Sequence, residues 1–225
     1  MPIKIQNKKE LGSGIYTIPD IGLLLGYPLY KVRRYIKKYW DEGIGKELFH
    51  DNYSWSVKNY KKAVNFYVLI ELYTFFQLQE CGVHTKGVVK ARKEIAKHLK
   101  TPYPFANRKI LTDGQHIWYY FEKDLISADP TCQLNFGKII ESFANKIDFS
   151  DDSLAERYWP RGKDSSIVVD PHHQFGQPVI KGSNIVTDTI YSMYQSGEKI
   201  KTLSVLYDIS EKEICDAIEF YKKAA

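Results

Sequence analysis

Residues 16–40 read YTIPDIGLLLGYPLYKVRRYIKKYW, and the spacing within this stretch decides the expected fold of the first part of the chain. Thr17 and Asp20 form a capping box, which begins a helix and places a carboxylate at its positive end. Gly26 suits the left-handed residue just past that helix, and Pro28 suits the first turn of the next. The stretch therefore predicts two helices joined by a very short turn.

The second of these helices is expected to bury one stripe and to expose cations elsewhere. Its apolar residues recur at spacings of three and four, and no acid occurs before Asp41. The stripe consists of Leu29, Val32, Ile36 and Tyr39, and the cations are Lys31, Arg33, Arg34, Lys37 and Lys38. A solvated basic helix is one interpretation. A cationic helix after a short helix and a tight turn is also typical of a recognition helix in the major groove of DNA, which we favour.

Residues 41–62 then combine two glycines with short apolar and aromatic runs, which predicts a β-hairpin wing. Residues 63–99 are expected to form a long apolar helix that ends near Cys81-Gly82, followed by a basic helix capped by Thr85. We expect the recognition helix, the wing and the basic helix to contact DNA. The expected DNA-binding residues are Tyr30, Lys31, Arg33, Arg34, Lys37, Lys38, Lys46, His50, Tyr53, Lys86 and Lys90.

This order of helix, turn, basic helix, wing and helix pair resembles the DNA-binding domain of the MerR family over about residues 15–98. The resemblance implies a homodimer that binds a palindromic double-stranded operator. No long coiled coil or effector domain follows, so the sensing of small molecules or metals is not expected.

The middle of the chain is expected to be a small mixed region. Residues 102–125 place Asp113-Gly114 between two apolar, aromatic runs, which is a strong hairpin signal. Farther along, Tyr158, Trp159 and Arg161 could form an interaction surface or an ordinary packed loop.

Residues 166–224 resemble the bacterial family of proteins of unknown function numbered 433. The features that carry the resemblance are Asp170-Pro171, the loop GQPVIKG at residues 176–182, a first helix over Val186 to Tyr194, Gly197, and a helix pair after it. The family commonly has Thr-Arg-Ile where this chain has Ser-Asn-Ile at residues 183–185. The missing arginine weakens any expectation that the loop binds an anion.

Longer members of that family, with a MerR-like first half, resemble VapB-like antitoxins that pair with PIN-type ribonuclease toxins. The resemblance implies that this chain binds such a toxin and represses its own operon as a transcription repressor.

The distribution of charge suggests different partners for the two halves of the chain. Residues 1–100 carry a net charge of +9 and residues 101–225 a net charge of −4, which suggests a polyanion for the first half and another partner for the second. In the last helix, Ser210 and Glu213 form a capping box, and the acids on its outer face would repel phosphate. We therefore favour toxin or dimer contacts here, with phosphate contacts by Lys181, Lys199 and Lys201 as the alternative. The expected contact residues are Glu211, Asp216, Glu219, Tyr158, Trp159 and Arg161.

Several other classes of function are not expected. His172 and His173 are adjacent and have no third ligand at a diagnostic spacing, so we expect neither a metal site nor another cofactor. No nucleophile motif or paired carboxylates indicate an enzyme. The chain has no signal-like leader and no run of about 18 apolar residues, so we expect a cytoplasmic protein without membrane contact.

The expected fold is α+β and mainly helical. It comprises a MerR-like winged helix-turn-helix at residues 1–100, a mixed connecting region with a β-hairpin at 101–165, and a three-helix antitoxin module that resembles a helix-turn-helix at 166–225. The expected function is that of a DNA-binding antitoxin in a type II toxin-antitoxin pair. The alternatives are a stand-alone MerR-like transcription regulator without a toxin and, from another class, a nucleic-acid enzyme or its accessory subunit.

Overall fold

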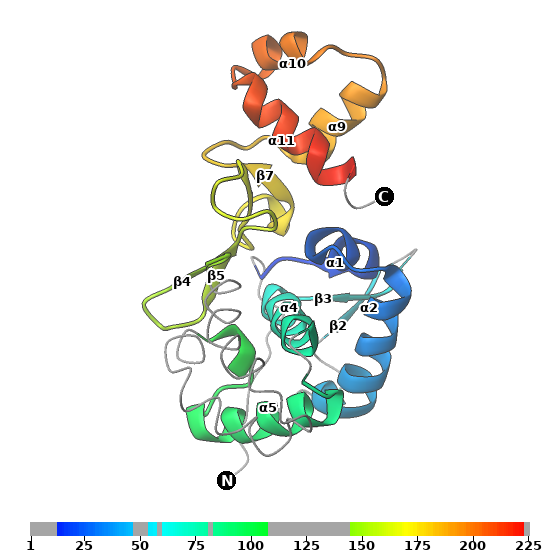
Figure 1. Ribbon diagram of the computed structural model, residues 1–225, viewed down its shortest axis with the longest axis vertical. Coiled ribbons are helices and arrows are strands. Elements are labelled where there is room, and N and C mark those ends of the chain that lie inside the picture. The colour runs from blue at the N-terminus through cyan, green and yellow to red at the C-terminus, as the bar shows by residue number, and fades with distance from the viewer. Residues whose placement is uncertain (1–12, 47–53, 58–59, 81–82, 108–144, 223–225) are drawn as a thin grey trace. The chain divides into compact units, whose positions relative to one another are not determined.

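The computed structural model describes residues 13–46, 54–57, 60–80, 83–107 and 145–222 (Figure 1). The described fold is of the α+β class and mainly helical, with two small sheets. Contacts group the chain into two compact units, Met1–Phe66 with Arg157–Ala225, and Tyr67–Glu156. The expected domain boundaries near residues 100 and 165 stay a prediction, and the hairpin expected around Asp113-Gly114 lies outside the described residues.

Helix α1 (Ile18–Leu25) begins and ends as the sequence predicts. The Oγ1 of Thr17 accepts a hydrogen bond from the backbone N–H of Asp20, and an Asp20 carboxylate oxygen accepts one from the Thr17 N–H at 2.8 Å. At the other end, Gly26 has φ of 71°, and its N–H donates to the carbonyl of Gly22. The capping box and the left-handed residue are therefore confirmed.

Helix α2 (Leu29–Tyr35) continues without a break into the π-helix η1 (Ile36–Ile44). Val32, Ile36, Trp40 and Ile44 are all buried and lie four residues apart. In a regular α-helix of 3.6 residues per turn, such a spacing drifts around the axis. A π-helix has more residues per turn, so the same four-residue spacing rotates in the opposite direction. The combination of α2 and η1 therefore keeps the four side chains on one face. The expected stripe is correct at Val32 and Ile36, whereas Leu29 is 41% exposed.

A three-stranded antiparallel sheet follows, in the order β1-β3-β2. Its strands are β1 (Tyr16–Thr17), β2 (Ser54–Val57) and β3 (Tyr60–Val64). The expected hairpin is present but begins later than predicted, because residues 41–44 still belong to η1. Pairing of Tyr16 with Val64 also adds β1 to the hairpin as a third strand.

Helices α4 (Phe66–Glu80) and α5 (Thr85–Leu99) match the expected helix pair. The residue that caps α5 is His84, whereas Thr85 is the first helical residue and its hydroxyl oxygen accepts a hydrogen bond from Gln79. The short helix η2 (Pro104–Ala106) lies in the same unit.

A buried ion pair joins α4 to α5. Arg92 and Glu71 are each about 2% exposed or less, and Arg92 Nε donates to a Glu71 carboxylate oxygen. Arg92 also donates to the Pro102 carbonyl at 2.7 Å, and Phe105 N–H donates to Glu71 at 2.7 Å. Burial raises the pKa of Glu71, and the guanidinium opposes that rise. Hydrogen bonds thus satisfy both charges, as a buried pair requires.

The last part of the chain contains a second sheet, of order β4-β5-β6-β7. Its strands are β4 (Ile147–Phe149), β5 (Ala155–Tyr158), β6 (Ile167–Val169) and β7 (Pro178–Ile180), with the short helix η3 (Gln174–Gly176) before β7. Strands β6 and β7 pair in antiparallel register, with Ile167 opposite Ile180.

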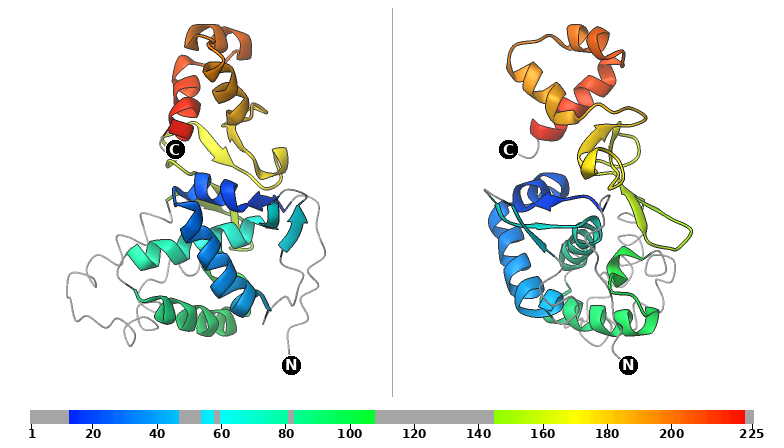
Figure 2. Two further views of the ribbon diagram at one scale, coloured as in Figure 1. Left: turned by 90° about the vertical axis from the view of Figure 1, so that its right-hand side faces the viewer. Right: turned by 180° about the vertical axis from the view of Figure 1, so that it is seen from behind.

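Three helices follow the sheet, α9 (Thr187–Gln195), α10 (Ile200–Tyr207) and α11 (Glu211–Lys222) (Figure 2). They pack around a core whose fully buried members are Ile180, Ile190, Leu203, Ile214 and Ala217. The Ser210 N–H donates to the Glu213 carboxylate at 2.8 Å, which confirms the second capping box. Among the described residues, no helix has the length and apolar character needed to cross a membrane.

Candidate functional site

The helix from Leu29 to Ile44 exposes a cationic surface. Its exposed cations are Arg33, Arg34, Lys37 and Lys38, which we call the basic face. The basic face lies away from the buried stripe of the same helix, because helical periodicity separates the two sets. Each of the two arginines has five N–H donors, which can bind phosphate oxygens or the edge of guanine.

The residues around the basic face take different positions. Tyr30 is 74% exposed at the start of α2. Lys31 is half-buried, and its Nζ lies 4.1 Å from the centre of the Tyr27 ring, so a cation–π contact holds it. Lys46 is exposed just past η1, and an ion pair between Asp41 and Lys62 joins η1 to β3 at 2.5 Å.

The other expected DNA contacts lie outside the described residues or in the second compact unit. His50 and Tyr53 lie outside the described residues. Lys86 and Lys90 are exposed on α5, which belongs to the second compact unit. The structure thus brings together the expected cations of α2 and η1 on one helix.

The acidic residues of α11 divide into two groups. Glu211 and Glu219 are exposed, as the sequence predicts. Asp216 is half-buried, and its Oδ2 accepts a hydrogen bond from the Ser166 N–H at 2.8 Å. The expected outward direction of Asp216 is therefore wrong, because this carboxylate holds the start of β6 against α11.

The expected surface around Tyr158 and Trp159 is also different. Tyr158 is 1% exposed and Trp159 is 6% exposed, so neither ring lies on the surface. Tyr158 pairs with Val169 across the sheet, and Trp159 packs against Val168 and Val179. Both side chains are therefore packed rather than exposed, although Tyr158 lies in strand β5 and not in a loop. Arg161 is exposed, and its guanidinium donates to the Phe220 carbonyl at 3.0 Å near the end of α11.

One exposed apolar pair was missed by sequence reasoning. Val205 is 84% exposed and Leu206 is 59% exposed on α10, whereas Leu203 of the same helix is fully buried. Helical spacing from Leu203 predicts the exposure of Val205, which lies two residues away, but it would place Leu206, three residues away, on the core face.

Comparisons with known proteins support part of this description. A family described as "Protein of unknown function (DUF433)" matches residues 167–221. A protein of Mycobacterium tuberculosis (strain ATCC 25618 / H37Rv) named "Putative antitoxin VapB45" is 23% identical over 164 residues, which are 67% of this chain and 68% of that protein. The crystal structure of Rv2018 from Mycobacterium tuberculosis has a similar fold. Its TM-score is 0.71 at 20% identity, over 90% of this chain and 96% of that one.

Proposed function

We propose that the chain is a DNA-binding antitoxin of a type II toxin-antitoxin pair. In this proposal it is a cytoplasmic homodimer that neutralises a PIN-type ribonuclease toxin by direct binding and represses its own operon. The observation that carries the proposal is the basic face on the second of two helices joined by a short turn, in a chain similar to a protein named "Putative antitoxin VapB45". The first feature supports DNA binding, and the second supports a toxin partner.

The DNA-binding part of the proposal uses the geometry of α1, α2 and η1. The buried stripe fixes the rotation of the second helix, so Arg33 and Arg34 stay exposed together with Lys37 and Lys38. In a MerR-like arrangement, this helix enters the major groove and the hairpin β2-β3 lies beside it as a wing. Cations that replace condensed counterions provide the affinity, and the arginines contribute base contacts.

The toxin-binding part uses the C-terminal module. Glu211 and Glu219 are exposed acids on α11, and such a surface suits a basic partner rather than phosphate. Asp216 and Arg161 already bind groups within the module, so we assign them to its stability. Glu211 and Glu219 are the proposed toxin contacts because both are exposed.

Retardation of the chain's own promoter fragment in a gel tests DNA binding. The variant Arg33→Ala with Arg34→Ala should bind at least about 30-fold more weakly, since each base-contacting arginine contributes about 1–3 kcal/mol and two are removed. Both side chains are exposed, so the variant should keep its fold. The matched control Lys163→Ala with Lys212→Ala removes two exposed cations of the C-terminal half and should bind normally. Equal binding by all three proteins would refute the recognition helix.

Co-expression with the product of the neighbouring gene tests the toxin partner. The chain should co-purify with that product, restore growth and inhibit its cleavage of RNA. The variant Glu211→Gln with Glu219→Gln should weaken the complex, whereas the arginine variant should leave it intact. Normal operator binding without any such complex would instead support the stand-alone MerR-like regulator.

A further inference from the structure

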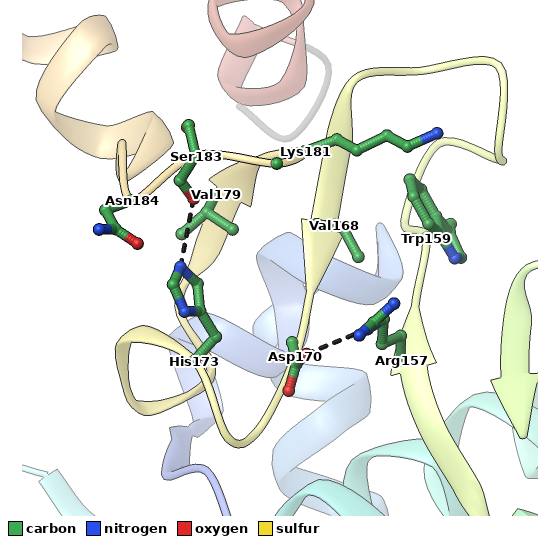
Figure 3. A pocket seen from close by; sticks show the side chains of 10 residues that line it. Arg157, Trp159, Val168, Asp170, His173, Val179, Lys181, Ser183 and Asn184 are labelled. Carbon is green, nitrogen blue, oxygen red and sulfur yellow. Dashed lines mark hydrogen bonds and ion pairs between the residues drawn. The ribbon is translucent and has the colours of Figure 1, made fainter. Parts of the chain in front are cut away.

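A cavity of about 340 Å³ opens between β5, β6 and the loop after β7 (Figure 3). Its lining comes from one continuous stretch of the chain, from Arg157 to Asn184, which belongs to one compact unit. Ligand sites in proteins occupy about 300–1,000 Å³, so this cavity suits a small ligand or a single side chain. None of its lining residues is part of the basic face.

The charges around the cavity are unequal. Asp170 uses both carboxylate oxygens, since Oδ2 accepts from Arg157 Nε at 3.0 Å and Oδ1 accepts from the His172 N–H at 2.9 Å. Arg157 therefore neutralises Asp170. Lys181 is exposed at the rim, with its Nζ 5.4 Å from the centre of the Trp159 ring, and it forms no ion pair with any described residue. The cavity consequently carries a net positive charge of about one unit.

The rest of the lining is apolar and held in place. Val168 and Val179 pack against Trp159, and all three side chains also line the cavity. Figure 3 shows the ends of the Arg157 and Lys181 side chains on the side of the cavity where Trp159 lies, Val179 beside His173 on the other side, and Val168 between the two sides. His173 contacts the Ser183 carbonyl at 3.2 Å through Nε2. A carbonyl can only accept a hydrogen bond, so Nε2 carries the proton. This hydrogen bond stabilises the position of the loop after β7.

We infer that this cavity binds a carboxylate on a short apolar stem. Lys181 and Arg157 bind the carboxylate, and Val168 and Val179 contact the stem. A phosphate dianion is disfavoured because its two negative charges exceed the net charge of about one positive unit, whereas a single negative charge matches it. A free organic acid and an acidic side chain or chain terminus of another protein share this chemistry. The inference does not depend on the proposed function.

Amide chemical shifts of the full chain in two-dimensional NMR spectra test the site, with isobutyrate as the probe. Isobutyrate should shift the amides of Val168, Val179 and Gly182 in a saturable way, with a dissociation constant in the millimolar range expected for so small a ligand. Lys181→Met keeps the stem over Trp159 and removes the charge, so it should weaken binding by about tenfold. The control Lys212→Met removes an exposed lysine of α11 outside the cavity and should bind normally.

Two further probes distinguish the source and the charge of the ligand. An acetylated peptide amide with one glutamate should bind more tightly than isobutyrate if the site serves a protein partner, and no more tightly if it serves a free acid. Inorganic phosphate should bind more weakly than isobutyrate to the natural chain. Asp170→Asn leaves Arg157 without its counter-charge and raises the net positive charge of the site, so phosphate should gain affinity.

Three results would overturn the inference: no saturable shifts at the cavity with either carboxylate probe, equal binding by Lys181→Met and the natural chain, or tighter binding of phosphate than of isobutyrate. The spectra themselves report whether each variant is folded, so a loss of binding can be separated from a loss of structure.

Discussion

Gly176 and Tyr16 make a close contact whose energy can be measured. A Cβ added at Gly176 would lie 2.2 Å from the Tyr16 hydroxyl oxygen, 2.8 Å from Cζ of that ring and 3.2 Å from the Gly14 Cα. Gly176 also has φ of +81°. We expect Gly176→Ala to lower the free energy of unfolding by about 2–5 kcal/mol. About 1–2 kcal/mol of this comes from the left-handed backbone and about 1–3 kcal/mol from overpacking.

Gly162→Ala is the matched control for this substitution. Gly162 has a similar φ of +89°, but nothing lies within 4 Å of its added Cβ. Gly162→Ala should therefore cost only the backbone term of about 1–2 kcal/mol. Urea unfolding followed by circular dichroism compares the two, and an unchanged slope with denaturant shows that only stability differs.

Removal of the Tyr16 hydroxyl tests whether the contact with Gly176 is the source of the overpacking cost. The hydroxyl is buried and has no hydrogen-bond partner in the described part of the chain, and burial raises the pKa of this phenol. Tyr16→Phe should thus stabilise the protein by about 1 kcal/mol, because an unsatisfied buried hydroxyl carries its full desolvation cost. In the double variant the 2.2 Å contact disappears, so Gly176→Ala should cost less than it does alone. Strictly additive effects, or equal losses for Gly176→Ala and Gly162→Ala, would refute the reasoning.

Two other substitutions test the stability of separate elements. Ser210→Ala removes the cap of α11 and should cost about 1 kcal/mol, measured by thermal unfolding; an unchanged midpoint would contradict the cap. Arg92→Met leaves Glu71 buried without its partner and should cost about 3–5 kcal/mol, measured by urea unfolding. Loss of the guanidinium raises the pKa of Glu71 further, so folding takes up a proton and the cost should shrink as the pH falls. A cost that grows toward acid pH would contradict that linkage.

Much of the fold follows from chemistry between near neighbours. Thr17 with Asp20 and Ser210 with Glu213 lie three residues apart, so each capping box could be predicted from spacing alone. The exposure of the basic face also follows from helical periodicity. By contrast, Glu71 and Arg92 lie 21 residues apart, and Ser166 and Asp216 lie 50 apart. The local sequence does not predict that the residues of these two pairs contact each other.

The candidate sites divide in the same way. Periodicity predicts which cations of α2 and η1 are exposed, but the burial of Tyr158 and Trp159 depends on how β5 and β6 pair. The cavity beside Asp170 also needs tertiary packing, because it forms only when β5, β6, β7 and the loop after β7 pack together. The π-helix was likewise missed, since the preference for wider turns comes from packing four buried side chains on one face.

That series of buried residues from Val32 to Ile44 limits how this helix can change during evolution. Residues between the anchors can be exchanged without disturbing the core, so the pattern of exposed cations can change while the fold is kept. An insertion or deletion between Val32 and Ile44 would instead rotate the anchors that follow it toward solvent. Related chains should therefore differ here by substitution and keep the same number of residues.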